Sequence, residues 1–230
     1  MESLNDSSQI SDSIGILLWD IDGTLIRKLG ESRFSRHLQA LGINKSTESQ
    51  DYAGLSDWDV LLNYTREYGI SDNDLKKAFE KLNTSEDANA TQLYQKLSGV
   101  EEILIETSNH GWRNGILTGN TYFSAIHKLQ STGLLNYFDA DILFFCKAQE
   151  SRLDIARRAK EILDHKVKPV IVIGDTEHDI KVAKEIGFSV ISVPSGIRTR
   201  EYLEKFQPNL ILDSLKLEPC QFMKHLASLL

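Results

Sequence analysis

Two aspartates stand where a short apolar segment of the sequence ends. Residues 16–19 are apolar, Asp20 and Asp22 follow, and Gly23 and Thr24 come next. Side chains two residues apart on an extended strand point to the same side, so two carboxylates could share one site. Acids this close repel each other unless a cation or a shared proton offsets their charge, and Mg²⁺ is the oxygen-preferring ion to expect first. An Asp-x-Asp-Gly pattern also makes ordinary turns, so this segment alone leaves both interpretations open.

Two later apolar segments end in polar residues of the same kind. Residues 115–117 lead into Thr118, Gly119 and Asn120, and residues 170–173 lead into Gly174, Asp175, Thr176, Glu177, His178 and Asp179. Each end could be a simple strand-to-helix turn, because Thr and Asp cap helices and Gly permits tight bends. Four aspartates gathered at one sheet edge would be costly without a cation. Together the three ends therefore favour a metal site.

The segments that must position these residues alternate between strand and helix patterns. Strands are predicted at 14–19, 115–118, 142–145, 170–173 and 189–193, and helices at 100–109, 122–131, 152–163, 177–186 and from Pro219 onward. Such alternation predicts a parallel sheet with helices on both faces, an α/β fold with a Rossmann-like, doubly wound core. In such sheets ligands bind beyond the carboxyl ends of the strands, where the acids lie.

An insertion of different character interrupts this pattern. Between residues 31 and 97 the sequence predicts helices and loops but no strand. The helical signals are apolar spacing over residues 34–41 and capping boxes at Ser56-x-x-Asp59 and Ser71-x-x-Asp74. We therefore expect a catalytic core of residues 14–30 and 98–230, an all-α cap of residues 31–97, and a disordered polar leader of residues 1–13.

Composition and charge limit the possible environment and partners. The 230 residues are 41% hydrophobic, enough for a globular core, and the net charge of −7 argues against general affinity for nucleic acid. The two cysteines, Cys146 and Cys220, indicate a reducing compartment. The apolar run after the leader is too short for a signal peptide or membrane span. A cytoplasmic protein without membrane partners, monomeric or homodimeric, is expected.

Three sequence motifs resemble those of the haloacid dehalogenase-like superfamily of phosphohydrolases, in its phosphoglycolate phosphatase-like branch. Residues 20–25 match Asp-x-Asp-Gly-Thr-Leu at every position, Thr118 matches the second motif, and residues 174–179 match Gly-Asp-x-x-x-Asp. The resemblance spans residues 14–30 and 98–213, and the inserted helical segment is similar to the small cap of that family.

The resemblance implies a role for each site residue. Asp20 would attack phosphorus, and Asp22 would protonate the leaving oxygen and then activate water. Mg²⁺ would be held by Asp20, by the backbone carbonyl of Asp22, and by Asp175, with Asp179 as a direct or second-sphere ligand. Thr118, Gly119 and Asn120 would bind the phosphate oxygens.

The third motif of that family, usually a lysine, is altered in this chain. The corresponding stretch, residues 146–153, holds both Lys147 and Arg152. We favour Arg152 as the replacement, since its guanidinium can bind phosphate with two parallel hydrogen bonds. For either residue the alternative is an exposed helix face.

Together these features predict a Mg²⁺-dependent phosphatase of a small phosphorylated metabolite. A phosphomutase of the same superfamily is the runner-up, and a non-catalytic phosphate-ligand-binding protein on this scaffold is the alternative from another class. Three further expectations concern single side chains. His178 is expected as a polar wall beside the site, Trp58 chiefly as packing within the cap although its loop could face substrate, and Arg198, Thr199 and Arg200 as surface.

Overall fold

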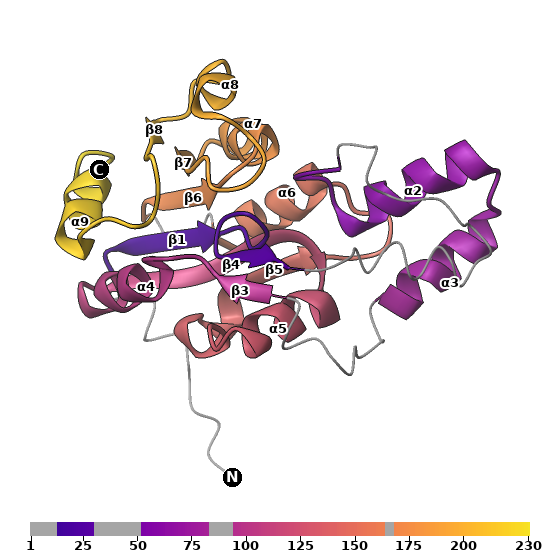
Figure 1. The fold of residues 1–230 in the computed structure, drawn as a ribbon, viewed down its shortest axis with the longest axis horizontal. Helices are drawn as coiled ribbons and strands as arrows, with labels where there is room; N and C mark the ends of the chain where they lie inside the picture. Colours follow the sequence, from indigo (N-terminus) through magenta and orange to yellow (C-terminus); the bar gives the residue numbers. More distant parts are fainter. Residues whose placement is uncertain (1–12, 30–51, 83–93, 164–167) are drawn as a thin grey trace, which may run out of the picture.

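A six-stranded parallel sheet forms the centre of the protein in the computed structural model, which describes residues 13–29, 52–82, 94–163 and 168–230. The strands lie in the order β5-β4-β1-β6-β7-β8 (Figure 1). They are β1 (Gly15–Trp19), β4 (Trp112–Thr121), β5 (Leu143–Cys146), β6 (Val170–Gly174), β7 (Ser189–Ser192) and β8 (Leu210–Ile211). Parallel neighbours that are not consecutive in sequence require crossover connections, here supplied by helices. The predicted α/β fold class is confirmed.

Helices cover both faces of this sheet (Figure 1). One face carries α4 (Val100–Asn109), α5 (Tyr122–Ser131) and α9 (Pro219–Ala227), and the other carries α6 (Arg152–Leu163), α7 (Glu177–Ile186) and α8 (Arg200–Glu204). Because side chains alternate along a strand, Ile16 and Leu18 of β1 join the core under α6 and α7, whereas Leu17 and Trp19 join the core under α4 and α5.

Strand β1 lies at the centre of the sheet and is buried over its whole length. It is paired with β4 on one side and β6 on the other, which explains its continuous apolar sequence. Trp19 is fully buried, stacks on Phe222 with 6.0 Å between ring centroids, and donates its indole N–H to Asn114 Oδ1 at 2.9 Å. The strand end that carries Asp20 and Asp22 is thus held by two neighbouring strands and by the core under α4 and α9.

The described part of the insertion contains α2 (Asp57–Tyr68) and α3 (Asp72–Leu82), which pack against each other. Each begins at its predicted capping serine: the Ser56 and Ser71 hydroxyls accept the backbone N–H groups of Asp59 and Asp74 at 3.1 and 3.2 Å. Trp58 meets Phe79 edge to face at 5.3 Å, as expected for cap packing. The predicted helix over residues 34–41 and residues 1–12 of the leader lie outside the described residues.

The expectation of an insertion without strands is wrong at its end. Strand β3 (Tyr94–Lys96) pairs antiparallel with β2 (Ile26–Lys28), so the two chain segments that lead into and out of the insertion lie side by side. Gln95 Oε1 accepts a 2.8 Å hydrogen bond from Arg27 Nε, 68 positions away in sequence. The strand is short and mostly exposed, so it has no apolar alternation by which a sequence pattern could reveal it. The domain boundaries at residues 30 and 97 stay a prediction.

Outside the insertion, the helices and strands predicted from the sequence agree closely with the structure. The predicted helices 100–109, 122–131, 152–163 and 177–186 coincide with α4, α5, α6 and α7, and the tail from Pro219 is α9. Strand β4 is longer than predicted, and the short β8 and α8 were not predicted.

Candidate active site

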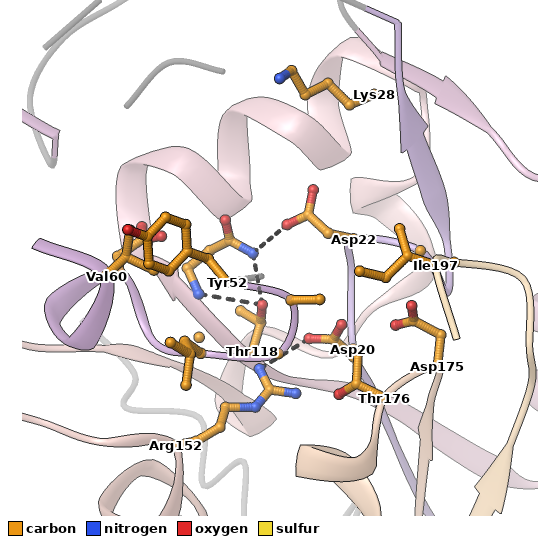
Figure 2. A pocket seen from close by; sticks show the side chains of 18 of the residues that line it. Asp20, Asp22, Lys28, Tyr52, Val60, Thr118, Arg152, Asp175, Thr176 and Ile197 are labelled. Atoms are coloured by element: carbon orange, nitrogen blue, oxygen red, sulfur yellow. Dashed lines mark hydrogen bonds and ion pairs between the residues drawn. The ribbon is translucent and has the colours of Figure 1, made fainter. Parts of the chain in front are cut away.

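The carboxyl ends of β1, β4 and β6 meet at one pocket of about 280 Å³ (Figure 2). Trp19, the last residue of β1, lies opposite Ile116 of β4 and Ile173 of β6, and the Asp20 N–H donates to the Ile173 carbonyl at 2.9 Å. The core lines the pocket with Asp20, Asp22, Thr118, Gly119, Asn120, Arg152 and Asp175. Of the predicted site residues, Asp179 alone does not line the pocket; it is fully buried in contact with Arg152.

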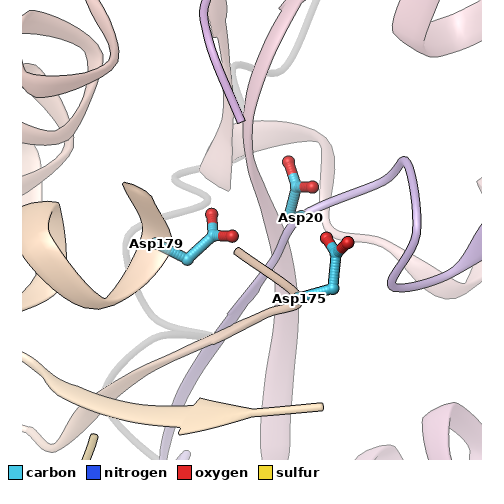
Figure 3. Close-up of side chains that lie close together, drawn as sticks. All are labelled: Asp20, Asp175 and Asp179. Atoms are coloured by element: carbon cyan, nitrogen blue, oxygen red, sulfur yellow. The ribbon is translucent and has the colours of Figure 1, made fainter. Parts of the chain in front are cut away.

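Three buried carboxylates form an acidic cluster at this sheet edge (Figure 3). They belong to Asp20, Asp175 and Asp179, and one oxygen of each lies within 4.8 Å of the others. Their exposed fractions are only 5, 3 and 0%. Three of the four aspartates predicted to gather at this edge are therefore found together, and their role as metal ligands stays a prediction. The Asp22 side chain is not part of the cluster and is 45% exposed, which leaves only its backbone carbonyl for the metal role that the resemblance implies.

Arg152 bridges two members of the acidic cluster. Its Nη1 donates to Asp20 Oδ1 at 3.0 Å, and its Nη2 donates to Asp179 Oδ1. The side chain comes from the first residue of α6 and is 6% exposed, so the attraction acts where water screens little. Lys147, the competing candidate, is exposed and does not line the pocket. The structure places Arg152 rather than Lys147 against the acids.

Asp179 is also tied to the start of α7. Its Oδ2 accepts hydrogen bonds from the backbone N–H and the hydroxyl of Thr176, at 3.1 and 2.8 Å, in a capping box. One carboxylate thus serves a helix terminus and the Arg152 fork at once, which fixes Asp179 in place.

Asp175 sits in a tight cradle and has little hydrogen-bonding compensation. Its one hydrogen-bond partner among the described residues is Thr24, whose hydroxyl donates to Oδ1 at 3.3 Å. A Cβ on Gly23 or on Gly196 would come within 2.2 or 1.8 Å of Oδ2. Glycine at both positions lets two backbone segments close on this carboxylate.

These surroundings change the acidity of the cluster. Burial raises the pKa of Asp20 from 3.8 to about 7, with Arg152 opposing the rise and Asp179 and Asp22 adding to it. Burial, followed by the charges of Asp20 and Asp179, raises the pKa of Asp175 well above its usual value. The positively charged side chains of the protein therefore do not fully neutralise the negative charge of the acidic cluster. A divalent cation with a preference for carboxylate oxygen fits this donor set.

Stability should depend on pH and Mg²⁺ together. A carboxyl whose pKa is about 7 in the folded state contributes stability below its ordinary value of 3.8, and this contribution is lost as pH rises toward 7. We therefore expect the Mg²⁺-induced rise in Tm to be larger at about pH 8 than at about pH 6, since protons compete with the ion. Thermal denaturation in EDTA and in Mg²⁺ at both pH values measures this. A Mg²⁺-induced rise in Tm that is equal at the two pH values would contradict this competition between protons and the ion.

Replacing Gly196 tests the cradle around Asp175. Gly196→Ala should displace the Asp175 carboxylate, lower the unfolding free energy by about 1–3 kcal/mol and weaken the Mg²⁺-induced rise in Tm. Gly133→Ala is the control: nothing lies within 4 Å of the position that its Cβ would take, but its φ of 73° costs about 1 kcal/mol. That control should keep the full Mg²⁺ response in thermal denaturation. An undiminished response in Gly196→Ala would refute the close packing.

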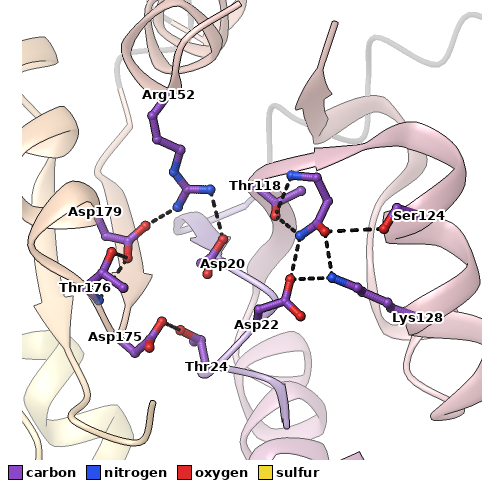
Figure 4. A network of polar contacts seen from close by, with 11 residues as sticks. Asp20, Asp22, Thr24, Thr118, Ser124, Lys128, Arg152, Asp175, Thr176 and Asp179 are labelled. Carbon is purple, nitrogen blue, oxygen red and sulfur yellow. Dashed lines mark hydrogen bonds and ion pairs between the residues drawn. The ribbon is translucent and has the colours of Figure 1, made fainter. Parts of the chain in front are cut away.

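A second polar network holds Asp22 on the other side of the pocket (Figure 4). Asn120 Nδ2 donates to Asp22 Oδ2 and to Thr118 Oγ1, both at 2.8 Å. Lys128 Nζ donates to the same Asp22 oxygen at 2.5 Å and to Asn120 Oδ1 at 2.6 Å. The Thr118 hydroxyl accepts from Asn120 and so keeps its own proton for donation.

Sequence reasoning missed Lys128. It is 6% exposed and lies on the buried side of α5 with Ser124, Ala125 and Leu129. A lysine is rarely buried unless it is paired, so its place within the apolar stripe of the 122–131 helix was the available signal.

Residues 52–57, which lead into α2 and include its first residue, close the pocket from the insertion side. The Asp57 carboxylate accepts the Thr121 backbone N–H at 2.8 Å, and Ser56 Oγ donates to the Glu150 carbonyl at 2.9 Å. A Cβ on Gly119 would lie 2.5 Å from the Leu55 carbonyl oxygen. Gly119, predicted as part of the phosphate site, thus also permits close approach of this segment to β4.

Comparison with known proteins decides the family. Residues 17–193 match the family model of haloacid dehalogenase-like hydrolases, which covers most of the chain. The chain belongs to the haloacid dehalogenase-like hydrolases. The predicted family and the prediction of an enzyme are both confirmed.

Individual proteins also match this chain over nearly its whole length. The pyrophosphatase PpaX of Bacillus cereus is 25% identical over 207 residues, which cover 88% of this chain and 93% of that protein. A predicted phosphatase from Clostridium acetobutylicum has the same fold, with a TM-score of 0.69, 20% identity and coverage of 92% and 99% of the two chains. A putative beta-phosphoglucomutase from Bacteroides vulgatus gives a TM-score of 0.65 at 16% identity, with coverage of 94% and 90%.

Two expectations for residues near the site have different outcomes in this hydrolase. His178 is 28% exposed beside Gly54, and burial lowers its pKa, consistent with a polar wall. The expectation that Arg198 is a surface residue is wrong: it is 13% exposed and holds the buried Glu177 carboxylate with bonds of 2.7 and 2.9 Å. Its partner is 21 positions away, so local sequence could not reveal the pair.

Among the helices of the described residues, none combines the length and apolar character needed to cross a bilayer.

Proposed function

We propose that this haloacid dehalogenase-like hydrolase is a Mg²⁺-dependent phosphatase that cleaves a phosphate monoester of a small metabolite. The observation that carries the proposal is the meeting of the acidic cluster with Arg152 and Thr118 at one pocket, which two of its three carboxylates, those of Asp20 and Asp175, line. A guanidinium and a hydroxyl suit an anionic, tetrahedral phosphoryl group, and the acids suit the cation that accompanies it.

In the first step, Asp20 acts as the nucleophile. A carboxylate oxygen of Asp20 forms a bond to phosphorus while the bond between phosphorus and the ester oxygen breaks, giving an aspartyl-phosphate. Asp22 donates its proton to the departing oxygen, so the product leaves as a neutral alcohol. Thr118 and Arg152 bind the oxygens of the transferring group, where charge develops in the transition state.

In the second step, water regenerates the enzyme. Asp22, now ionised, accepts a proton from water as the water oxygen attacks phosphorus. The bond between phosphorus and the Asp20 oxygen breaks, and inorganic phosphate is released with Asp20 free. The network of Asn120 and Lys128 keeps the Asp22 carboxylate at the pocket throughout.

The acidic cluster would hold the ion. Asp20 and Asp175, with the Asp22 backbone carbonyl, would bind Mg²⁺, and Asp179 would act directly or through its hold on Arg152. When bound, the ion would draw negative charge from the phosphoryl oxygens and screen them from the Asp20 carboxylate.

Phosphate release from p-nitrophenyl phosphate tests the proposal. We expect turnover in Mg²⁺, loss of turnover in EDTA, and recovery when Mg²⁺ is restored. Turnover that is indifferent to EDTA would sink the metal requirement, and no turnover of any phosphate ester would favour the non-catalytic ligand-binding alternative. A panel of phosphorylated metabolites then identifies the ester.

Inorganic pyrophosphate is the second candidate substrate, since the relatives named PpaX are described as pyrophosphatases. It belongs in the same panel, measured at equal Mg²⁺. A phosphomutase, the third possibility, would move phosphate between positions of a sugar phosphate with little release of inorganic phosphate. Product analysis therefore separates all three activities.

A further inference from the structure

A buried lysine faces the carboxylate that lies outside the acidic cluster. Lys128 projects from α5, is 6% exposed, and directs its ammonium to Asp22 and Asn120 (Figure 4). The Tyr94 ring of β3 lies 5.6 Å from the same nitrogen, at a distance typical of a cation–π contact. An ammonium so enclosed is a fixed positive charge, because side-chain motion would break several contacts at once.

The hydrogen-bond pattern around Lys128 admits a single arrangement. Lysine only donates, so the Asn120 atom that faces it must be the carbonyl Oδ1. The amide nitrogen of Asn120 then faces Asp22 Oδ2 and Thr118 Oγ1, both of which can accept. Lys128 therefore sets the orientation of the Asn120 amide as well as contacting Asp22 directly. Two donors converge on one oxygen of Asp22.

We propose that Lys128 is a positioning residue, which holds the Asp22 carboxylate and the Asn120 amide in the orientation that proton transfer to the leaving oxygen requires. This inference rests on the proposed function, in which Asp22 is the acid and base. The Asp22 side chain is 45% exposed, so it needs an anchor to stay aimed at the pocket. Misplacement of a catalytic group by about 1 Å can cost about 10²-fold in rate.

The anchor is rigid because of the helix that carries it. Ala125 and Leu129, the neighbours of Lys128 on α5, are fully buried against the sheet. Ser124, one turn earlier, donates to Asn120 Oδ1 at 3.3 Å, which adds a second donor to the same amide oxygen. The residues that hold Asp22 in place thus come from α5 and β4.

Lys128→Met tests the proposal with two substrates that differ in their leaving group. Methionine keeps the apolar stem and removes the ammonium. An alkyl phosphate such as glycerol phosphate needs a proton on its leaving oxygen, whereas p-nitrophenolate leaves well without one. Because Asp22 also activates water in the second step, which is the same for both esters, the first step is measured by itself, as alcohol release in single turnovers. We expect its rate to fall about 10²-fold for the alkyl ester and less than about tenfold for the aryl ester, with little change in the substrate concentration that gives the half-maximal rate. Lys128→Arg, which keeps a charged donor, should recover part of the loss.

Three comparisons keep the test decisive. Lys147→Met, an exposed lysine outside the pocket, is the matched control and should behave as the wild type. In an Asp22→Asn background, Lys128→Met should cause little further loss, because both changes remove the same function. An unchanged Mg²⁺-induced rise in Tm would show that the variant folds and keeps its acidic cluster.

Other outcomes overturn the proposal. Equal losses of the first-step rate with both esters would mean a general structural role, and a rise in the half-saturating substrate concentration alone would mean that Lys128 binds substrate. Full additivity with Asp22→Asn would likewise refute coupling between the two residues. These outcomes concern Lys128 alone, because the proposed phosphatase function is supported as long as the wild-type protein is active. A wild-type protein without activity would refute the proposed function itself.

Discussion

Asp20→Asn is expected to reduce phosphate release by about 10³-fold or more, the scale seen when a covalent nucleophile is removed. Asparagine has nearly the same shape and can still accept the hydrogen bond from Arg152 Nη1, now 3.0 Å from Asp20 Oδ1. It lacks the charge and the nucleophilic oxygen needed to displace the ester. Steady-state rates with an aryl phosphate in Mg²⁺ measure the effect, and full turnover would refute the assignment of the nucleophile.

The same substitution should not destabilise the metal-free protein. Because burial raises the pKa of Asp20 to about 7, its ionised form is unfavourable at higher pH, and asparagine removes that charge. In EDTA at about pH 8, the Tm of the variant should equal or exceed that of the wild type. Asp213→Asn is the charge-matched control, since Asp213 is exposed and pairs with Arg200 at 3.2 Å. It should leave activity unchanged, and a folding defect in Asp20→Asn would contradict the electrostatic account.

Arg152→Ala is expected to lower both stability and activity. Removing one partner from a buried ionic network costs about 3–5 kcal/mol of unfolding free energy, since the remaining charges stay buried. Here Asp20 and Asp179 would both lose their cation. Activity should fall about 10²–10³-fold, because a donor to the transferring phosphoryl group is lost. Urea denaturation with and without Mg²⁺ measures the stability, and we expect the ion to recover part of the loss.

Lys147→Ala provides the comparison within the same segment. Its side chain is exposed and outside the pocket, so stability should change by less than about 0.5 kcal/mol. Activity should stay within about twofold of the wild type. If this variant were inactive while Arg152→Ala kept full activity, the choice between the two cations would be reversed.

Much of the fold could be predicted because its signals are local. The buried strand β1 is a continuous apolar run, and the helices α4 to α7 show regular apolar spacing, so each could be recognised from its own residues. The convergence of Asp20, Thr118 and Asp175 also followed from sequence, since parallel strands present their carboxyl ends at one edge. The motif in residues 20–25 supplied the family, which the match over residues 17–193 confirms.

The pairings between side chains depended on tertiary structure. The sequence favoured Arg152 over Lys147 only through the chemistry of its guanidinium. The orientation of α6 is what brings Arg152 to Asp20, 132 positions away. Lys128 reaches Asp22 across 106 positions, and β3 exists because β2 lies beside it. Sequence alone determined the longer strands and helices of the core and which acids stand at strand ends. The folded chain decided which cation neutralises which acid, because that depends on distances and burial between segments that a local pattern does not encode.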